Sequence, residues 1–345
     1  MRLLALLICL FSLLIVRAIT PDLFMYQLLW IAVGVIAYIL VSRIDTKVFE
    51  GLWPLWYVLL LGFLALSLFG PEVRGSHRWI DLFGVRMQPS ELLKPVYVLS
   101  LAAYLSSTKE YTIGRFLRFT GLFLIPTLIV FKQPDLGNSL VYSFIVFALL
   151  FASFFPFVYY IAPFVLSMVV TPFLWEHLAA YQKLRIITFI NPGYDLQGAG
   201  YNARQALIAV GSGGWFGKGL GEGTQSKLQF LPEFHTDFIF ASTVEQLGFV
   251  GGLFLLLLYF LLLLKILKVA RNTPDTFCKL YAYGLFGQLF IQVIINVGMN
   301  IGILPITGIT LPLFSFGGSS MIATWIGLGI LGGFPKPKEH PVAIG

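Results

Sequence analysis

Residues 247–264 read LGFVGGLFLLLLYFLLLL, eighteen positions without a charged side chain. A helix needs roughly 20 mostly apolar residues to cross about 30 Å of hydrocarbon, so this run predicts a membrane-spanning helix. Three carboxylates, Glu233, Asp237 and Glu245, lie directly upstream of it. They approach or enter the membrane, where an ionised group is costly and therefore indicates a candidate functional site.

A glycine-rich run precedes these three carboxylates. Seven of the thirteen residues from 211 to 223 are glycine, with Lys218 inside the run and Lys227 just after it. Backbone N–H groups in such a run can converge on an anion such as phosphate. The alternative is a flexible linker, and the spacing matches neither GxxxxGK[ST] nor GxGxxG, so a nucleotide site is not supported. Trp215 and Phe216 favour a loop that folds back onto the membrane interface.

The composition extends the membrane assignment to the whole chain. Hydrophobic residues make up 58% and charged residues 11% of it, and the mean hydropathy is +0.86; a soluble domain carries about twice that charge. The net charge of +7 arises largely from basic residues between apolar runs, which fits membrane topology better than nucleic-acid binding. Cys9 and Cys278 suggest no disulfide framework, and four histidines without HxxxH spacing favour no zinc site.

Apolar runs elsewhere predict an all-α polytopic membrane protein that forms one domain over residues 1–345. About ten spans are expected, at 3–17, 23–42, 52–70, 89–106, 117–132, 138–154, 156–175, 238–264, 277–303 and 314–334. The first run can also be a cleaved signal peptide, but Arg17 in the expected cleavage region argues against processing.

An even number of spans places both termini on one side of the membrane. Basic residues such as Arg43, Lys109 and Lys265 share the side of the N-terminus, which favours that side as the cytoplasmic one. The opposite loops also carry basic residues, among them Arg78 and Arg86, but these lie beside acidic residues and resemble a site more than a topology signal. Residues 176–237, between the seventh and eighth spans, then form one long extracytoplasmic loop with the carboxylates at its downstream membrane edge.

Ionisable residues also lie near the ends of predicted spans. Glu91 and Lys94 are three apart and share a helix face, and Lys132 lies close to Asp135, with Pro134 breaking the helix between them. Each pair is either an internal ion pair that fixes helix packing or part of a substrate path.

Neutral polar residues present a similar choice. Gln292, Asn296, Asn300 and the GGSS run at 317–320 either line the same cavity or join helices through hydrogen bonds. Helix packing is favoured for the small residues.

Several blocks together resemble the SEDS family of bacterial cell-wall proteins, and the resemblance runs in order over nearly the whole chain. They are RGSHRWIDLFGVRMQPSELLK (74–94), KQPDLGNS (132–139), YQKLRI (181–186), GAGYNARQALIAVGSGGWFGKGLGEGTQSKLQFLPEFHTDFIFA (198–241) and GILPITGITLPLFSFGGSS (302–320). Within the family, KQPDLGNS and GILPITG are more similar to the rod-shape proteins than to the division proteins.

The resemblance implies a ten-helix peptidoglycan glycosyltransferase of the bacterial inner membrane that polymerises lipid II during cell elongation. It also implies a class B penicillin-binding transpeptidase and other membrane proteins of the elongation complex as partners, and an active site that faces the periplasm or exterior. The essential acid of the family matches Asp237, which the residues alone do not separate from Glu233 or Glu245. Gln246 and Phe316 stand where the family often has glutamate and usually has tyrosine.

The chemistry agrees with these residue types. Forming a β-1,4 link from an α-linked sugar diphosphate inverts the anomeric carbon, so one displacement needs a base and stabilisation of the departing diphosphate. Asp237 is the candidate base. The candidates for binding substrate or diphosphate are Arg74, Arg78, Glu91, Lys94, Lys132, Arg204, Lys218, Lys227, Glu245 and Ser319. No metal ligand is assigned, although a divalent cation shared by Asp237 and diphosphate oxygens is compatible with the chemistry.

Two other functions are considered beside the glycosyltransferase. A lipid II flippase would use Glu91, Lys94, Lys132 and Asp135 as a translocation path, but it has less need of the long outer segment. A non-catalytic scaffold would activate a partner synthase and would tolerate loss of Asp237.

Overall fold

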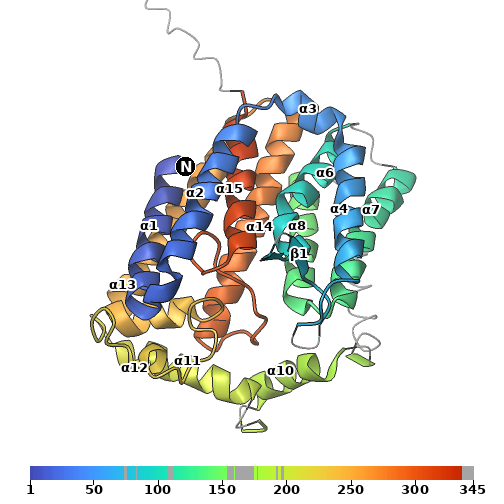
Figure 1. Cartoon of the computed structure of the whole chain (residues 1–345). Coiled ribbons are helices and arrows are strands. Elements are labelled where there is room, and N and C mark those ends of the chain that lie inside the picture. Colours follow the sequence, from blue (N-terminus) through green and yellow to red (C-terminus); the bar gives the residue numbers. More distant parts are fainter. Residues whose placement is uncertain are drawn as a thin grey trace, which may run out of the picture.

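The computed structural model describes residues 1–73, 76–82, 84–107, 112–153, 159, 175–176, 178–191, 193–195 and 198–335. The described chain is a bundle of long helices with an arc of shorter helices across one end (Figure 1). The bundle helices are α1 (Arg2–Ile19), α2 (Phe24–Val41), α4 (Trp53–Ser67), α6 (Lys94–Ser106), α7 (Ile113–Lys132), α8 (Leu136–Ala152), α13 (Ile239–Asn272), α14 (Thr276–Asn300) and α15 (Gly318–Gly332).

These nine helices match nine of the ten predicted spans; the tenth, 156–175, lies almost wholly outside the described residues. Within the described chain, five helices are long and apolar enough to cross a membrane. The all-α expectation is confirmed, with one small exception, a hairpin of β1 (Ile80–Leu82) and β2 (Val85–Met87). The shorter helical segments are η1 (Pro21–Leu23), α3 (Thr46–Gly51), α5 (Pro89–Leu92), α10 (Ala180–Ile190), α11 (Ala199–Gly213) and α12 (Thr224–Lys227).

Helix boundaries follow local capping chemistry. Asp135 caps α8 by accepting a hydrogen bond from the Asn138 backbone N–H at 3.1 Å, and Asp275 caps α14 in the same way from Cys278 at 2.8 Å. The span predicted at 89–106 is split into α5 and α6 at Leu93, and Pro95 occupies the first turn of α6. Asp135 is thereby fixed at the end of a buried helix.

The helices approach closely where glycines face large side chains. α14 packs between α13, α8 and α6, and α15 packs along α2. A Cβ atom at Gly34 of α2 would lie 2.4 Å from the Trp325 ring of α15, and one at Gly284 of α14 would lie 2.6 Å from Val98. Small residues therefore let these helix backbones meet, as in other membrane bundles.

The arc of α10, α11 and α12 lies across the end of the bundle opposite α3 and the N-terminus (Figure 1). The predicted outer segment 176–237 thus carries three helices in the described part of the chain. From this arc the chain enters α13, which continues to Asn272, beyond the predicted limit of 264.

The glycine-rich run 211–223 is ordered against α13, so the expectation of a flexible linker is wrong, and several of its N–H groups are used within the protein. The Lys218 and Gly219 backbone N–H groups donate at 3.0 Å to carbonyl oxygens of α13, those of Glu245 and Gln246. The Gly221 N–H donates at 3.0 Å to the Gln246 side chain. These N–H groups are occupied by the protein, so they do not converge on an external anion.

A break in α13 makes this contact possible. Gly248 has φ +70° and ψ −168° inside the helix, and Gly217 in the run has φ +79°. A Cβ atom on Gly217 would lie 2.0 Å from the Gln246 carbonyl oxygen, so the two backbones cross where side chains do not fit. The Phe249 N–H donates at 2.8 Å to the Gly214 carbonyl oxygen, which replaces the helix partner lost at the break.

Candidate active site

A polar cavity of about 430 Å³ lies at the end of the bundle covered by α10. Side chains from segments far apart in the sequence line it: Ser76, Arg78, Trp79, Arg86, Gln88, Glu91, Pro134, Asp135, Leu136, Tyr181, Gln182, Arg185, Glu233, Thr236, Asp237, Ile306, Thr307, Gly308, Thr310, Phe316, Gly317, Gly318, Ser319 and Ser320. The cavity therefore collects the family-like blocks into one place, although the chain separates them widely.

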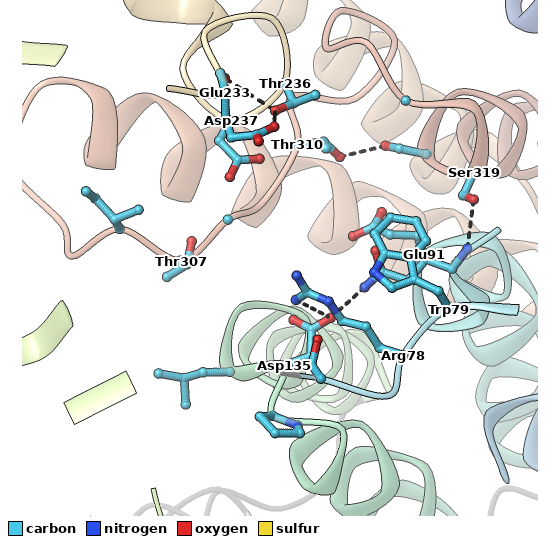
Figure 2. A pocket seen from close by; sticks show the side chains of 18 of the residues that line it. Arg78, Trp79, Glu91, Asp135, Glu233, Thr236, Asp237, Thr307, Thr310 and Ser319 are labelled. Carbon is cyan, nitrogen blue, oxygen red and sulfur yellow. Dashed lines mark hydrogen bonds and ion pairs between the residues drawn. The ribbon is translucent and has the colours of Figure 1, made fainter. Parts of the chain in front are cut away.

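Asp237 lies two residues before α13 and its side chain reaches the cavity (Figure 2). Its backbone carbonyl oxygen accepts hydrogen bonds from the amide groups of Asn296, at 2.9 Å, and Asn300, at 3.0 Å. The Asn300 side-chain oxygen accepts in turn from the Ala241 backbone N–H at 2.9 Å. Two buried asparagines of α14 thus hold the backbone of the carboxylate, which makes the helix-joining interpretation of these residues correct.

The turn before Asp237 is held from the other side by the segment that leads into α15. The Ser315 hydroxyl donates to the Thr236 carbonyl oxygen at 2.6 Å, and the Phe316 N–H donates to the His235 carbonyl oxygen at 2.9 Å. The Thr236 hydroxyl donates to the Glu233 carboxylate at 3.0 Å (Figure 2). The carboxylate of Asp237 is therefore presented by a turn fixed on two sides.

Arg185 of α10 supplies positive charge beside Asp237. A Cβ atom at Gly308 would lie 3.5 Å from Oδ2 of Asp237 and 3.7 Å from Nη1 of Arg185, so the two side chains flank the same glycine. Burial lowers the pKa of the Arg185 guanidinium, and the Asp237 carboxylate opposes this shift. An arginine remains charged under such a shift, so the cavity presents a cation beside its carboxylate.

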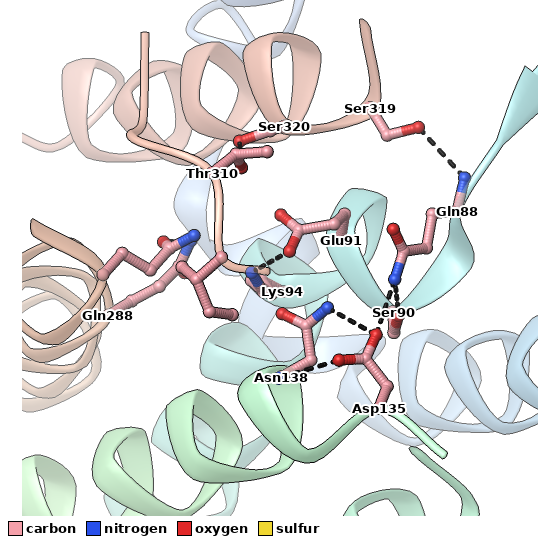
Figure 3. Close-up of polar contacts among 12 residues, drawn as sticks. Gln88, Ser90, Glu91, Lys94, Asp135, Asn138, Gln288, Thr310, Ser319 and Ser320 are labelled. Carbon is pink, nitrogen blue, oxygen red and sulfur yellow. Dashed lines mark hydrogen bonds and ion pairs between the residues drawn. The ribbon is translucent and has the colours of Figure 1, made fainter. Parts of the chain in front are cut away.

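The opposite wall of the cavity carries a second carboxylate, that of Asp135, and a second guanidinium group, that of Arg78. Arg78 lies 3.8 Å from Oδ2 of the buried Asp135, and the Gln88 amide donates to the same oxygen at 2.6 Å. The Gln88 backbone N–H donates to the Ser319 hydroxyl at 3.0 Å, which ties this wall to α15 (Figure 3). The pairing of Lys132 with Asp135 is wrong: Lys132 is exposed at the end of α7, and Asp135 faces Arg78.

Glu91 and Lys94 form the predicted ion pair, with 2.7 Å between Nζ and Oε1 (Figure 3). Glu91 lines the cavity, whereas Lys94 is fully buried behind it. The second oxygen of Glu91, Oε2, has no hydrogen-bond partner within the described chain. The pair thus fixes the packing of α5 on α6, and it leaves one buried carboxylate oxygen without a partner in the described part of the chain.

The remaining basic candidates lie away from Asp237. Lys218 pairs with Glu245 at 3.2 Å, and Lys227 pairs with Glu222 at 3.1 Å. Arg204 lines a separate, smaller cavity. Arg74 lies outside the described residues. Of the predicted basic residues that the structure describes, only Arg78 shares the cavity of Asp237.

Several polar cavity residues, among them Arg185 and Gln88, were not among the predicted ligands. Arg185 comes from the block YQKLRI and Gln88 from the block that also contains Arg78. Both blocks carry the family resemblance, which was the available signal. Neither residue type stands out there, because Arg185 is one of several basic residues in a polar segment.

The described residues contain no group of three or more His, Cys, Asp or Glu side chains that could hold a metal ion. An all-protein cage is therefore not formed within that part of the chain. A hard divalent cation can instead be held by one or two carboxylates together with substrate phosphates, and Asp237 and Glu233 are suitable oxygen donors on the cavity wall. A divalent cation is compatible with this chemistry but is not predicted.

Comparisons with known proteins identify relatives over most of the chain. The FtsW/RodA/SpoVE family model, described as a cell cycle protein, matches residues 3–336. The peptidoglycan glycosyltransferase MrdB of Escherichia coli K12 is 41% identical over 307 residues, which cover 87% of this chain and 82% of MrdB. A probable peptidoglycan glycosyltransferase FtsW of Marinomonas mediterranea is 38% identical over 315 residues, with coverage of 88% and 77%.

A solved structure is also similar over nearly the whole chain. It comes from a study of how a peptidoglycan synthase complex coordinates polymerization and crosslinking. Its matching chain is 31% identical with a TM-score of 0.84, and the match covers 96% of this chain and 95% of that one.

Proposed function

The chain belongs to the FtsW/RodA/SpoVE family of cell cycle proteins, and on that premise we propose that it is a peptidoglycan glycosyltransferase that polymerises lipid II. The observation that carries the proposal is the Asp237 carboxylate, held on a cavity wall beside Arg185 and across from Arg78. One carboxylate and fixed cations are what an inverting transfer from a sugar diphosphate requires.

In the proposed reaction Asp237 accepts the proton of the 4-hydroxyl of the acceptor sugar. The acceptor oxygen bonds to C1 of the donor sugar while the bond from C1 to the diphosphate oxygen breaks, and its electron pair leaves with the diphosphate. The base contributes about 10²- to 10⁴-fold in rate. Arg78 and Arg185 are placed to stabilise the negative charge that develops on the leaving group.

The proposal also sets the direction of the chain in the bacterial cytoplasmic membrane. Both termini face the cytoplasm, and the end with the cavity and α10 faces the periplasm or exterior, where glycan strands are made. The basic residues between the spans support this orientation. The substrate is anchored in the membrane by its lipid, so its reacting sugar lies at the membrane surface. A cavity at that edge of the bundle is therefore placed to bind the sugar.

A crosslinking enzyme is the proposed partner. The similar solved structure comes from a complex that coordinates polymerization with crosslinking. We propose that a class B penicillin-binding transpeptidase supplies the crosslinking activity beside this chain. Assignment to the elongation branch is supported by KQPDLGNS and GILPITG and by the slightly higher identity with MrdB than with FtsW. Other elongation-complex membrane proteins are proposed partners on the same ground.

Incubation of the purified chain with its transpeptidase partner and labelled lipid II tests this function. Glycan strands longer than the starting disaccharide are expected, with release of polyprenyl diphosphate. Movement of labelled lipid II across vesicles without any elongation would instead favour a flippase and contradict the proposal.

A further inference from the structure

A second cavity of about 220 Å³ lies beside the first, between α10, α11 and the end of α14. Arg185 and Ile306 line both cavities, so the two are neighbours that share a wall. The complete lining of the second cavity is Arg185, Thr188, Phe189, Ala203, Arg204, Leu207, Met299, Gly302, Leu304, Pro305 and Ile306. Apart from Thr188 and the two arginines, its side chains are apolar.

The mouth of this cavity is apolar as well. Phe189 and Leu207, which line it, are 40% and 47% exposed, and the neighbouring Ile190 and Ile303 are 77% and 66% exposed. Large apolar side chains at such exposure at the end of a membrane bundle face lipid more favourably than water. The cavity therefore borders an apolar surface on one side and shares a wall with the polar cavity on the other.

The charges on this cavity are both positive. Arg204 forms no ion pair with any residue that the structure describes, and Arg185 stands in the wall shared with the Asp237 cavity. Guanidinium groups bind phosphate oxygens through paired N–H donors. An apolar compartment with arginines at its polar end matches a molecule whose apolar chain begins directly at a phosphate group.

We propose that the second cavity seats the isoprenoid units next to the diphosphate of a polyprenyl diphosphate, with Arg185 holding the diphosphate where the two cavities meet. This inference rests on the proposed function, since it supplies a seat for the lipid end of that substrate or product. Arg204 adds a second cation at the rim.

The volume of the second cavity matches a short part of the isoprenoid chain. An apolar cavity of about 150 Å³ accommodates benzene, and an isoprene unit has one carbon fewer. A cavity of about 220 Å³ therefore holds one to two isoprene units, on the order of one and a half benzene molecules. The remaining units would lie along the exposed apolar side chains of α10 and α11.

Binding of farnesyl diphosphate and of inorganic diphosphate to the purified full-length chain tests the proposal. The wild-type chain should bind farnesyl diphosphate more tightly than inorganic diphosphate. Ala203→Phe fills the cavity, and Leu207→Ser makes its wall polar. Each should weaken binding of farnesyl diphosphate about tenfold, the loss expected for roughly two buried CH₂ groups, and leave binding of inorganic diphosphate unchanged.

Ile208→Phe is the matched control, because Ile208 lies on the same helix, is 43% exposed and lines neither cavity. It should bind both probes as the wild type does. Leu207 is half exposed, so Leu207→Ser keeps the test valid if Ala203→Phe fails to fold. Farnesyl diphosphate binding that is unchanged in both cavity variants, or weakened equally in Ile208→Phe, would overturn the proposal.

The same assay separates this inference from the proposed function, because binding of the probes needs no sugar transfer. If the protein prefers farnesyl diphosphate to inorganic diphosphate but does not polymerise lipid II, only the glycosyltransferase proposal is contradicted. If the wild-type protein polymerises lipid II normally but binds the two probes equally well, only the proposed isoprenoid-binding cavity is contradicted.

Discussion

Asp237 and Glu245 lie eight positions apart at the start of the same helix, yet their surroundings differ completely. Asp237 is half-buried and lines the polar cavity. Glu245 is 0% exposed, and its oxygens accept from the Lys218 ammonium at 3.2 Å and the Gln225 backbone N–H at 2.9 Å. The Asp237 carboxylate reaches the space where a substrate would bind, whereas the Glu245 carboxylate is buried and bonded to other groups of the protein.

The difference shows how a buried charge is kept in a membrane protein. Helix α12, which follows the glycine-rich run, supplies Glu245 with further donors, the hydroxyl groups of Thr224 and Ser226, so that its burial is compensated. That network ties the run to α13, next to the break at Gly248. Glu245 thus holds the preceding loop on α13, whereas Asp237 lines the cavity.

The largest expected effect belongs to Asp237→Asn. The amide keeps the shape of the side chain but cannot accept a proton, so polymerisation of lipid II should fall about 10²- to 10⁴-fold. Thermal unfolding in detergent should stay close to the wild type, because the side chain lies at a cavity. An inactive variant that also unfolds early would place Asp237 with Glu245 as a structural residue.

Glu245→Gln should have the opposite profile. Removing one partner of a buried ion pair costs about 3–5 kcal/mol, and the lower end applies here since Lys218 is 29% exposed. The unfolding temperature should therefore drop clearly, while the activity of the folded fraction falls less than in Asp237→Asn. The double variant Lys218→Met with Glu245→Leu should recover part of the stability, and failure to do so would argue against the ion pair as the cause.

Gly217→Ala tests the crossing of the glycine run and α13. Gly217 and Gly219 both have positive φ, +79° and +104°, but a Cβ atom clashes only at Gly217, 2.0 Å from the Gln246 carbonyl oxygen. Alanine costs roughly 1–2 kcal/mol at either site for the backbone conformation, and Gly217→Ala should cost more because of the clash. Equal unfolding temperatures for the two variants would show that the crossing is loose.

Asn300→Asp should have the smallest effect of the four. The Asn300 amide donates to the carbonyl oxygens of both Asp237 and Asn296. A buried aspartate is neutralised by protonation, so it can still accept from the Ala241 N–H but keeps only one donor for these two oxygens. Loss of one positioning hydrogen bond is worth about 1 kcal/mol, or roughly a fivefold lower turnover. A change in KM alone, with turnover intact, would mean that Asn300 does not position the carboxylate.

The sequence predicted the bundle better than the site. Apolar runs identify spans directly, because length and hydropathy suffice, and α13 differs mainly in extending past Lys265 to Asn272. Side-chain partners depend on which helices meet. Lys132 is the last residue of α7 and Asp135 caps α8, so the two side chains do not pair although they are close in sequence. Asp135 lies near Arg78 instead.

The glycine-rich run shows a second limit. Its many N–H groups are compatible with a linker, an anion site or a packed loop, and only the position of α13 decides among them. Lys218 looked like a phosphate ligand for the same reason, and it pairs with Glu245. Family resemblance singled out Asp237, whereas spacing and charge alone did not separate it from Glu233 or Glu245.

Chemical rescue by formate tests the contrast between the two carboxylates most directly. Asp237→Ala and Glu245→Ala are assayed for lipid II polymerisation with and without added formate. Formate should restore part of the activity of Asp237→Ala, because a small base can enter the cavity, and should leave Glu245→Ala unchanged. Rescue of Glu245→Ala, or of neither variant, would contradict the assignment of Asp237 as the base.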